Sequence, residues 1–379
     1  MALFSGKKKV NTNGKETIKN EASVLSVDSA RLRPLFSTNM QSKNIIPFLL
    51  LFSLFSFSLN CSGKGPFPES DVRDLHLVID AGSSGTRFCL YRMQFTSSSS
   101  NSCKIKQGEC RSVVADDGLA ALPPEKAKEA LRGGFASLTE AQKNRIVHVS
   151  LLGTGGFRRL SSSAQKTAMT GLAEAIFETG LPATVRVISG EEEALLAWRS
   201  IHSETGSNSH AIIETGGATV QVATGTDGRV NRSISLPLGM NETRSHLKKE
   251  SACFSAPSAD RFDTCKRELL PLLGPLRQWT VPERNTYGLG NPYAAIFKQL
   301  DRDEIRRTDI DARGRLLCAS DSEQMAEYGI AAEHQKLTCY LFAFHSAQLE
   351  LLGVESVQKG SGSWPPGAAL SPEFFPSCR

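Results

Sequence analysis

Two short glycine-rich turns repeat one arrangement of residues that could bind phosphate. The first is Ile79-Asp80-Ala81-Gly82-Ser83-Ser84-Gly85-Thr86, and the second is Ile213-Glu214-Thr215-Gly216-Gly217-Ala218-Thr219-Val220. Each follows a run of β-forming residues, places an acid at the strand end and returns into a second apolar strand. Glycine lets the backbone approach a ligand closely, and exposed backbone N–H groups form nests for anions. The repeat therefore predicts two lobes that close on one polyphosphate–metal complex.

Two segments between these turns could complete the chemistry. Gly153-Thr154-Gly155-Gly156-Phe157-Arg158 follows an apolar strand, and Ser189-Gly190-Glu191-Glu192-Glu193-Ala194 begins a helix. Hydrolysis of a phosphoanhydride needs donors for the phosphoryl oxygens, a metal that neutralises charge and a base that aligns water. The turns supply the donors, and a carboxylate at the helix start supplies the base. Taken alone, however, a run of three glutamates is usually a solvated helix start favoured by the helix dipole.

In combination, these segments resemble the apyrase family, the nucleoside triphosphate diphosphohydrolases of the actin/Hsp70/sugar-kinase superfamily. The resemblance is carried by Asp-Ala-Gly-Ser-Ser-Gly-Thr-Arg (80–87), Ile-Ser-Gly-Glu-Glu-Glu-Ala-Leu-Leu-Ala-Trp (188–198) and Gly-Gly-Ala-Thr-Val-Gln (216–221). These motifs come in the family's order and at a similar spacing. The similarity covers residues 75–245 and fades afterwards, where 287–291 could stand for the last family motif.

The resemblance implies an α/β fold of two actin-like (ribonuclease-H-like) lobes, with the active site in the cleft between them. It also implies a divalent cation, Mg²⁺ or Ca²⁺, and a nucleotide substrate that loses phosphate by direct attack of water. Glu193 would be the base that activates this water, and Thr219 and Gln221 would position it. Asp80 and Glu214 would hold the metal through water. The phosphate-binding positions would be polar and glycine residues of the loops: Ser83, Ser84, Gly85, Thr86, Arg87, Thr154, Arg158, Gly216, Gly217 and Ala218.

The second turn departs from the apyrase pattern and leaves alternatives open. The family usually has Asp where Glu214 stands, and the added methylene moves the carboxylate, so a non-catalytic nucleotide-binding protein is conceivable. The exopolyphosphatase/guanosine pentaphosphatase family shares the fold, and residues 188–194 and 235–239 resemble it at least as well. The turn at 82–87, Gln221 and an export signal favour apyrase. A kinase of this fold is disfavoured because its acid would not be a glutamate at a helix start.

The composition is that of an ordinary globular protein, with 40% hydrophobic and 22% charged residues and a net charge of +5. Residues 1–60 hold eight Lys/Arg and three Asp/Glu, whereas the remainder holds 36 of each sign. The globular part therefore carries no electrostatic footprint for nucleic acid, and we expect no nucleic-acid partner.

The N-terminal region indicates export. Ile45–Leu59 is a 15-residue apolar stretch after Lys43, which suits a signal-peptide h-region and is too short to span a bilayer comfortably. Cys61 follows it and resembles the lipidated residue of a bacterial lipoprotein. We therefore expect an extracytoplasmic protein, held at the membrane by a lipid on Cys61. Secretion without a lipid and an uncleaved anchor are the alternatives.

Nine cysteines support an oxidising compartment. Pairs that flank short segments could form disulfides: Cys103 with Cys110, Cys253 with Cys265, and Cys318 with Cys339. Cys89 lies in an expected strand, where a small buried thiol is the simpler interpretation. No Cys-x-x-Cys or Cys/His cluster points to zinc.

The pattern along the chain divides it into two lobes. We expect a leader and signal peptide over 1–60, a tether over 61–74, a first lobe over 75–205 and a second over 206–339. A helix near 340–352 would complete the first lobe, and 359–379, rich in Gly, Ser and Pro, would be a flexible tail. Helices are expected over 123–142, 157–179, 191–201 and, with breaks, 323–352; strands are expected over 75–80, 88–95, 146–152 and 184–188.

Overall fold

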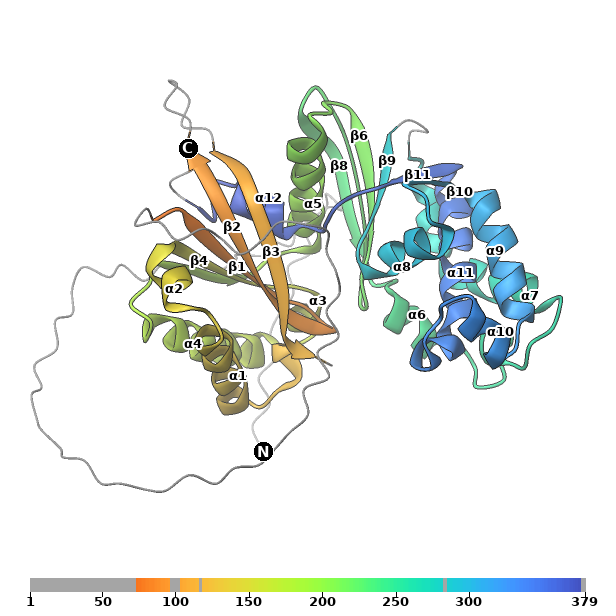
Figure 1. Cartoon of the computed structure of the whole chain (residues 1–379), viewed down its shortest axis with the longest axis horizontal. Helices are drawn as coiled ribbons and strands as arrows, with labels where there is room; N and C mark the ends of the chain where they lie inside the picture. The colour runs from red at the N-terminus through yellow and green to blue at the C-terminus, as the bar shows by residue number, and fades with distance from the viewer. Residues whose placement is uncertain (1–72, 96–102, 116–117, 282–284, 376–379) are drawn as a thin grey trace, which may run out of the picture.

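The computed structural model describes residues 73–95, 103–115, 118–281 and 285–375. Within these residues two β-sheets form the centres of two lobes, with helix α5 (Gly190–Thr205) between them (Figure 1). The expected α/β class is confirmed. The segment 45–59, expected as a signal peptide, and Cys61, expected as a lipid anchor, lie outside the described residues. No helix in the described part of the chain has the length and apolar character of a membrane span.

The first lobe is built on a sheet of order β3-β2-β1-β4-β5. Its strands are β1 (Leu75–Ala81), β2 (Gly85–Phe95), β3 (Cys103–Ala115), β4 (Ile146–Gly153) and β5 (Ala183–Val187). The first three are antiparallel, and the last two run parallel to β1. The helices of this part of the chain are α1 (Pro124–Ala136), α2 (Glu140–Arg145), α3 (Gly155–Arg158) and α4 (Ser162–Phe177), and a 3₁₀ turn forms at Leu119–Ala121. The central strand β1 is buried throughout and shares an apolar core with α1 and α4.

The second lobe is built on a sheet of order β10-β11-β9-β6-β7-β8. Its strands are β6 (His210–Thr215), β7 (Val220–Thr226), β8 (Arg229–Leu236), β9 (Thr286–Leu289), β10 (Glu304–Arg306) and β11 (Ser356–Lys359). Its helices are α6 (Met240–Ser245), α7 (Arg261–Leu272), α8 (Asn291–Leu300), α9 (Arg307–Ala319), α10 (Ser322–Glu327) and α11 (Ala332–Leu352), with 3₁₀ turns at Ala252–Phe254 and Gly274–Gln278. The order β8-β7-β6-β9 repeats the order β3-β2-β1-β4 of the first lobe.

The two glycine turns occupy equivalent positions in this repeat. In the first turn the Gly82 N–H donates to the Gly85 carbonyl at 3.0 Å, and in the second the Gly216 N–H donates to the Thr219 carbonyl at 2.9 Å. The acid of each turn also has the same place in its hairpin, because Asp80 pairs with the residue seven positions later and so does Glu214. The turns are therefore structural copies, as their sequences predict.

The helices α5 and α12 (Pro365–Ala369) join the lobes. The sequence of α5 follows the first sheet, but the helix packs on β6, β7 and β8 of the second. Its buried Trp198 shares an apolar cluster with Ile212 and Ala223 of that sheet. Helix α12 packs on α5 and on β1 (Figure 1). The lobe boundary expected near Gly206 therefore marks the end of α5, not a separation of two independent cores.

Two expectations for the C-terminal region are wrong. The helix near 340–352 is part of α11, which packs on α7 and α9 and contributes to the core of the second lobe instead of completing the first. The segment expected as a tail is ordered up to residue 375, because Trp364, Phe374 and Phe375 are each at most 2% exposed. The Gly, Ser and Pro content of the segment indicated a tail, but its aromatic side chains pack into the core and hold it in place.

Capping residues determine where several of the helices begin. Helix α5 begins with a capping box, since the Ser189 hydroxyl accepts from the Glu192 N–H and the Glu192 carboxylate accepts from the Ser189 N–H. The helix expected over 123–142 is broken into α1 and α2, because Thr139 forms a second capping box and begins a new helix. The helix expected over 157–179 is likewise broken, and Ser161 caps its longer part, α4.

Disulfides link neighbouring elements in both lobes. Cys253 bonds Cys265 and Cys318 bonds Cys339, as expected. The expected pairing of Cys103 with Cys110 is wrong, because Cys110 bonds Cys89 across the antiparallel strands β2 and β3. The free buried thiol expected at Cys89 is therefore also wrong. The two residues are directly opposed in the strand register, which the spacing along the chain did not reveal.

We predict that peptide mapping without reduction recovers a Cys89–Cys110 cross-linked peptide. Replacing both residues by alanine should lower the free energy of unfolding by about 3 kcal/mol. The cross-link restricts the unfolded chain, and this value is typical of a loop of similar length. Denaturant unfolding of the double variant measures the effect. Recovery of a Cys103–Cys110 peptide would contradict the assigned pairing.

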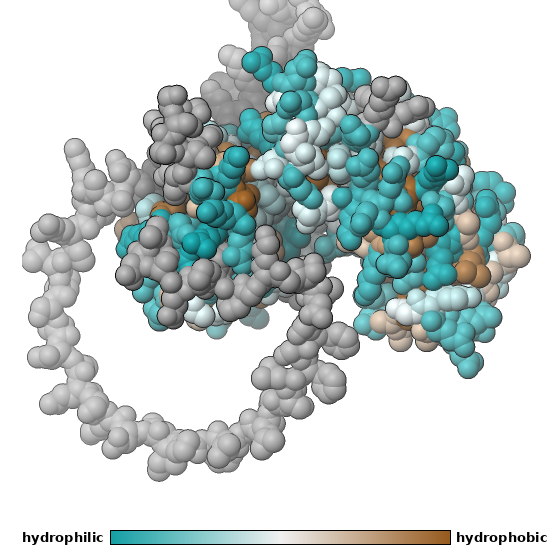
Figure 2. Space-filling view, turned by 45° about the horizontal axis from the view of Figure 1, so that its top comes forward, coloured by the Kyte–Doolittle hydropathy of each residue, from teal (hydrophilic) through white to brown (hydrophobic). Residues whose placement is uncertain are grey.

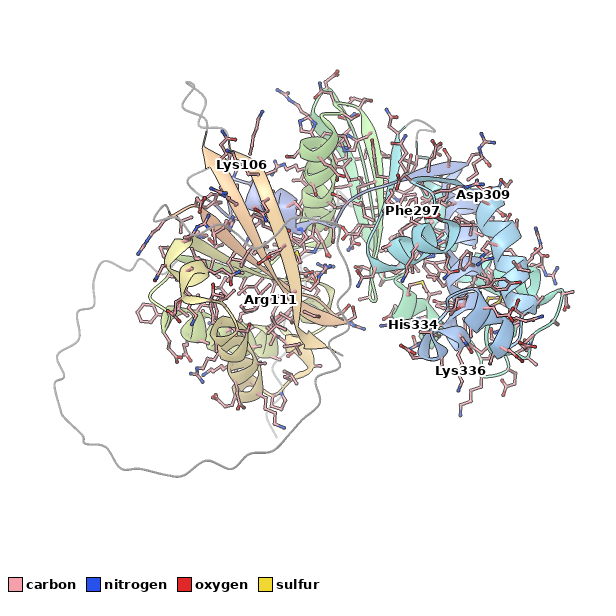
Figure 3. All side chains as sticks on the ribbon, in the orientation of Figure 1. Lys106, Arg111, Phe297, Asp309, His334 and Lys336 are labelled. Atoms are coloured by element: carbon pink, nitrogen blue, oxygen red, sulfur yellow. A yellow bond between two sulfur atoms is a disulfide. The ribbon has the colours of Figure 1, made fainter. Side chains whose placement is uncertain are left out.

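The surface is polar and carries charges of both signs. Hydrophilic side chains cover most of the coloured face in Figure 2. Exposed Lys106 lies on β3 and exposed Lys336 lies on α11 (Figure 3). Glu333, near the start of α11, is also exposed. This mixture agrees with the expectation of no nucleic-acid partner, which stays a prediction.

Candidate functional site

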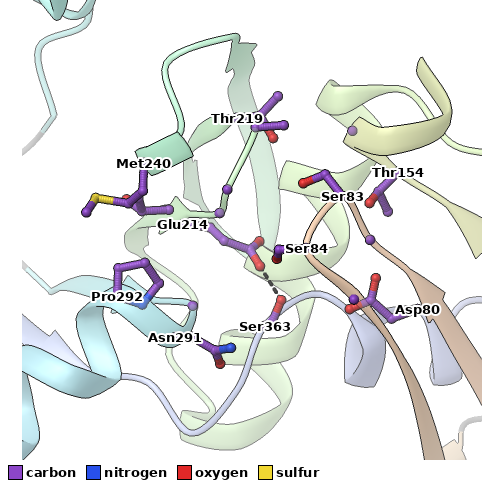
Figure 4. A pocket seen from close by; sticks show the side chains of 18 of the residues that line it. Asp80, Ser83, Ser84, Thr154, Glu214, Thr219, Met240, Asn291, Pro292 and Ser363 are labelled. Atoms are coloured by element: carbon purple, nitrogen blue, oxygen red, sulfur yellow. Dashed lines mark hydrogen bonds between the residues drawn. The ribbon is translucent and has the colours of Figure 1, made fainter. Parts of the chain in front are cut away.

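A cavity of about 290 Å³ lies between the lobes, and both glycine turns line it (Figure 4). The first lobe contributes Asp80 and residues 82–85, and the second contributes residues 214–219. The turns approach each other closely, because a Cβ atom added at Gly217 would lie 3.5 Å from the Ser83 hydroxyl oxygen. The structure thus brings both copies of the motif to one site.

The first turn presents its serines to the cavity while its end is anchored behind. Ser83 and Ser84 line the cavity. Gly85 has a φ of +148°, a value that favours glycine. Thr86, expected to bind phosphate, is fully buried instead, and its hydroxyl accepts from the Leu119 N–H at 3.3 Å. Thr86 therefore supports the turn from behind.

The second turn is fixed by the start of α6. The Gly216 carbonyl accepts from the Met240 N–H at 2.9 Å, and the Gly217 carbonyl accepts from the Asn241 N–H at 2.8 Å. The Ala218 carbonyl accepts from the Gly239 N–H at 3.1 Å. Because the carbonyl side of the turn is committed to α6, we expect its amide side to be the one that an anion meets.

The loop after β4 carries two expected site residues, Thr154 at the cavity and Arg158 behind Glu193. Thr154 lines the cavity. Arg158, expected to bind phosphate, is not among the lining residues; its guanidinium donates to the Glu193 carboxylate at 2.9 Å and to the Ile188 carbonyl at 3.1 Å. In this structure Arg158 therefore holds Glu193 at the start of α5.

Glu193 is a buried carboxylate that faces the cavity. It is 7% exposed, and burial raises its pKa above the ordinary value of 4.5. The positive charge of Arg158 and hydrogen bonds from Arg158 and Gln221 act in the opposite direction but do not outweigh burial. A carboxylate whose pKa lies closer to neutrality is a better proton acceptor at working pH.

Thr219 and Gln221 form one polar group beside Glu193. Thr219 lines the cavity, whereas Gln221 is not among the lining residues and is 1% exposed. The Gln221 amide donates to the Thr219 hydroxyl at 2.6 Å and also contacts Glu193. Thr219 is thus the member placed to touch a bound molecule, and Gln221 connects it to the carboxylate.

Glu214 is a buried carboxylate whose pKa is raised above the ordinary value for glutamate. Burial and then the nearby charge of Glu193 raise its pKa, and a hydrogen bond from Ser363 opposes this rise. The Ser363 hydroxyl donates to Oε1 of Glu214 (Figure 4), while Oε2 is buried with no hydrogen-bond partner among the described residues. The sequence interpretation missed Ser363, because its Gly-Ser context indicated a tail. The neighbouring Trp364 was the signal that this segment is buried.

Asp80 lies opposite Glu214 in the cavity and pairs with Arg87. The Arg87 guanidinium donates to Oδ2 of Asp80 at 3.0 Å through Nε and at 2.5 Å through Nη2. The charge of Asp80 raises the pKa of Arg87 further. Arg87 lines the cavity as expected and keeps the charge of Asp80 balanced.

The donor set fits a hard divalent cation held indirectly. In the parts of the chain that the structure describes, no group of three His, Cys, Asp or Glu side chains could hold a metal directly. Asp80 and Glu214 nevertheless line one cavity, and the unpartnered Oε2 of Glu214 needs a positive or donating partner. Carboxylate oxygens alone suit Mg²⁺ or Ca²⁺, with water completing the shell.

The model of the Ppx/GppA phosphatase family matches residues 172–273 of this chain. This segment contains Glu193, Glu214 and Gln221 but not the first glycine turn. It corresponds to the family that the sequence analysis kept as the alternative to apyrase.

Solved structures show the same fold. The crystal structure of the Ppx/GppA family member from Aquifex aeolicus has a TM-score of 0.59 and 16% identity, covering 78% of this chain and 96% of that one. An exopolyphosphatase from Cytophaga hutchinsonii has a TM-score of 0.54 and 17% identity, covering 78% and 96%. Nucleoside triphosphate hydrolases from Neospora caninum have a TM-score of 0.55 and 13% identity, covering 78% and 92%. The expected fold of two actin-like lobes is therefore confirmed.

The buried carboxylates predict how stability depends on pH. Because the pKa of Glu214 is higher in the folded chain than the ordinary 4.5, the folded state retains a proton that the unfolded state loses as pH rises. The free energy of unfolding should therefore fall between pH 5 and pH 8. Glu214→Gln is always neutral and should lose less stability over this range. Thermal unfolding in EDTA measures both curves.

The exposed Glu191→Gln serves as the control and should follow the wild type. Parallel curves for the wild type and Glu214→Gln would contradict the assigned burial effect.

Proposed function

We propose that this chain is a divalent-cation-dependent phosphohydrolase that cleaves the terminal phosphoanhydride bond of a phosphate chain. The observation that carries this proposal is Glu193, a buried carboxylate beside a cavity lined by two facing glycine turns. Arg158 and Gln221 orient Glu193, so its carboxylate can accept a proton from water without first rearranging. Thr219, in the second glycine turn, orients the attacking water.

The phosphate chain is bound between the lobes by groups that are already in place. The two turns provide the backbone amides of residues 83–85 and 217–218, because the Gly82 and Gly216 N–H groups are used within the turns. Ser83, Ser84 and Thr154 provide hydroxyl donors. Such preorganised donors stabilise the charge on the transferred phosphoryl group. A bound divalent cation would neutralise charge on the phosphate oxygens, and Asp80 and Glu214 are the residues that would hold it through water.

Two substrate classes have separate support. The match to the Ppx/GppA family favours long-chain polyphosphate or guanosine pentaphosphate. Nucleoside tri- and diphosphates are favoured by the apyrase-like turn at 80–87 and by the cavity itself. Among the described residues that line the cavity, Arg87 is the only cation, and Asp80 balances it. A long polyanion needs a more basic surface, so the cavity suits a short phosphate chain whose charge a single divalent cation can neutralise.

A phosphate-release panel tests the proposed function. Purified residues 62–379 are assayed with ATP, ADP, GDP, UDP, pyrophosphate, guanosine pentaphosphate and polyphosphate, each with Mg²⁺ and with Ca²⁺. We expect release from at least one substrate and its loss in EDTA. Binding of a nucleotide analogue without any phosphate release would instead favour a non-catalytic binding protein.

We predict that Glu193→Gln lowers turnover by roughly 10²–10⁴-fold, the usual contribution of a general base, while binding of a non-hydrolysable analogue is retained. The amide keeps the size of the side chain but cannot accept the proton. Glu191→Gln, on the same helical turn but exposed, should keep wild-type turnover. Unchanged turnover in Glu193→Gln would remove Glu193 from the role of base.

We also propose that the protein is exported through the apolar segment 45–59 and anchored by a lipid on Cys61. The disulfides in both lobes support this location, because such bonds persist in oxidising compartments.

A further inference from the structure

The segment between β11 and α12 crosses from one lobe to the other at the cavity. Strand β11 pairs with β9 in the second sheet, whereas α12 packs on α5 and on β1 of the first sheet. Residues 360–364 connect them, and Ser363 lines the cavity (Figure 4). The neighbouring Trp364 lines it as well. The backbone path is tightly packed, because a Cβ added at Gly360 would lie 2.2 Å from Leu289. Ser363 is therefore held in place from both sides.

Ser363 is buried at the cavity, where a hydroxyl group without a hydrogen-bond partner would destabilise the fold. It is 8% exposed, and its partner Glu214 is 5% exposed. The hydroxyl donates to Oε1 of Glu214, and Oε2 has no hydrogen-bond partner within the part of the chain that the structure describes. One oxygen of this carboxylate is thus fixed by the protein, and the other is the one left to a ligand.

We propose that Ser363 is a positioning residue that holds Glu214 so that Oε2 is presented to a divalent cation and its water. This inference rests on the proposed function. A glutamate has one more rotatable bond than aspartate, so its carboxylate loses more freedom when it is fixed. The hydrogen bond from Ser363 limits this freedom before the cation arrives. Partners of ligating carboxylates commonly control metal affinity in this way.

A purely structural role for Ser363 makes a different prediction. The C-terminal segment is anchored independently of the hydroxyl, because Trp364, Ala368 and Ala369 are buried in the cluster between the lobes. Removing one hydroxyl group should therefore leave the fold intact. A structural role would change thermal stability but not the affinity for a cation.

The test measures binding of Mn²⁺ to the substrate-free protein by calorimetry. We expect Ser363→Ala to raise the dissociation constant for Mn²⁺ by about 10-fold or more. This is within the range found when the hydrogen-bond partner of a ligating carboxylate is removed. Ser363→Thr keeps a hydroxyl and should restore most of the affinity. The matched control is Ser361→Ala, two residues earlier, since Ser361 is exposed and donates to Glu204 through its backbone N–H.

A second comparison keeps the proposal testable if Ser363→Ala folds poorly. Ser363→Cys keeps the size of the side chain but is a weaker hydrogen-bond donor, so it should weaken Mn²⁺ binding as Ser363→Ala does. Glu214→Gln should also weaken Mn²⁺ binding, and adding Ser363→Cys to it should change the affinity less than twofold. Wild-type affinity in a folded Ser363→Ala variant, or no Mn²⁺ binding by the wild type, would overturn the role of Ser363. Mn²⁺ binding that depends on Ser363 without release of phosphate from any substrate would uphold that role and refute the proposed hydrolysis.

Discussion

The site depends on placing several carboxylates in one buried cavity. Asp80, Glu193 and Glu214 repel one another, and each must be stabilised before the lobes can close around them. The structure does so with a different partner for each: Arg87 pairs with Asp80, Arg158 pairs with Glu193, and Ser363 donates to Glu214. Only the last partner is neutral. Glu214 is therefore the carboxylate most in need of an added cation, which is a physical reason to place the metal beside it.

The fold meets this requirement by duplication. The same hairpin occurs in each lobe, with the acid at the same position relative to the glycine turn. Because α5 of the first lobe packs on the second sheet and α12 returns to the first, the two turns are held facing one another. Glu193 lies at the start of α5, so the element that joins the lobes also carries the proposed base.

Much of the site was predictable because its chemistry is local. Backbone nests need glycines in a short turn, and an acid at a strand end points to the same edge of the sheet in each copy. A helix cap needs a hydroxyl and an acid three residues apart, which placed the start of α5 at Ser189. The Asp80 and Glu214 turns and the position of Glu193 follow from such short patterns. Thr86 was assigned to phosphate because the pattern could not show that its side chain points into the core.

The amino-acid sequence by itself determined the two glycine turns, the helix start that carries Glu193 and the α/β class, since each depends on residues within a few positions of one another. Only the tertiary structure decided the contacts between distant segments. It paired Cys89 with Cys110, placed α11 in the second lobe and brought Ser363 to Glu214. These contacts arise from strand register and from the packing of the C-terminal aromatic side chains. Neither leaves a fixed spacing along the chain, because the separation between partners depends on everything folded between them.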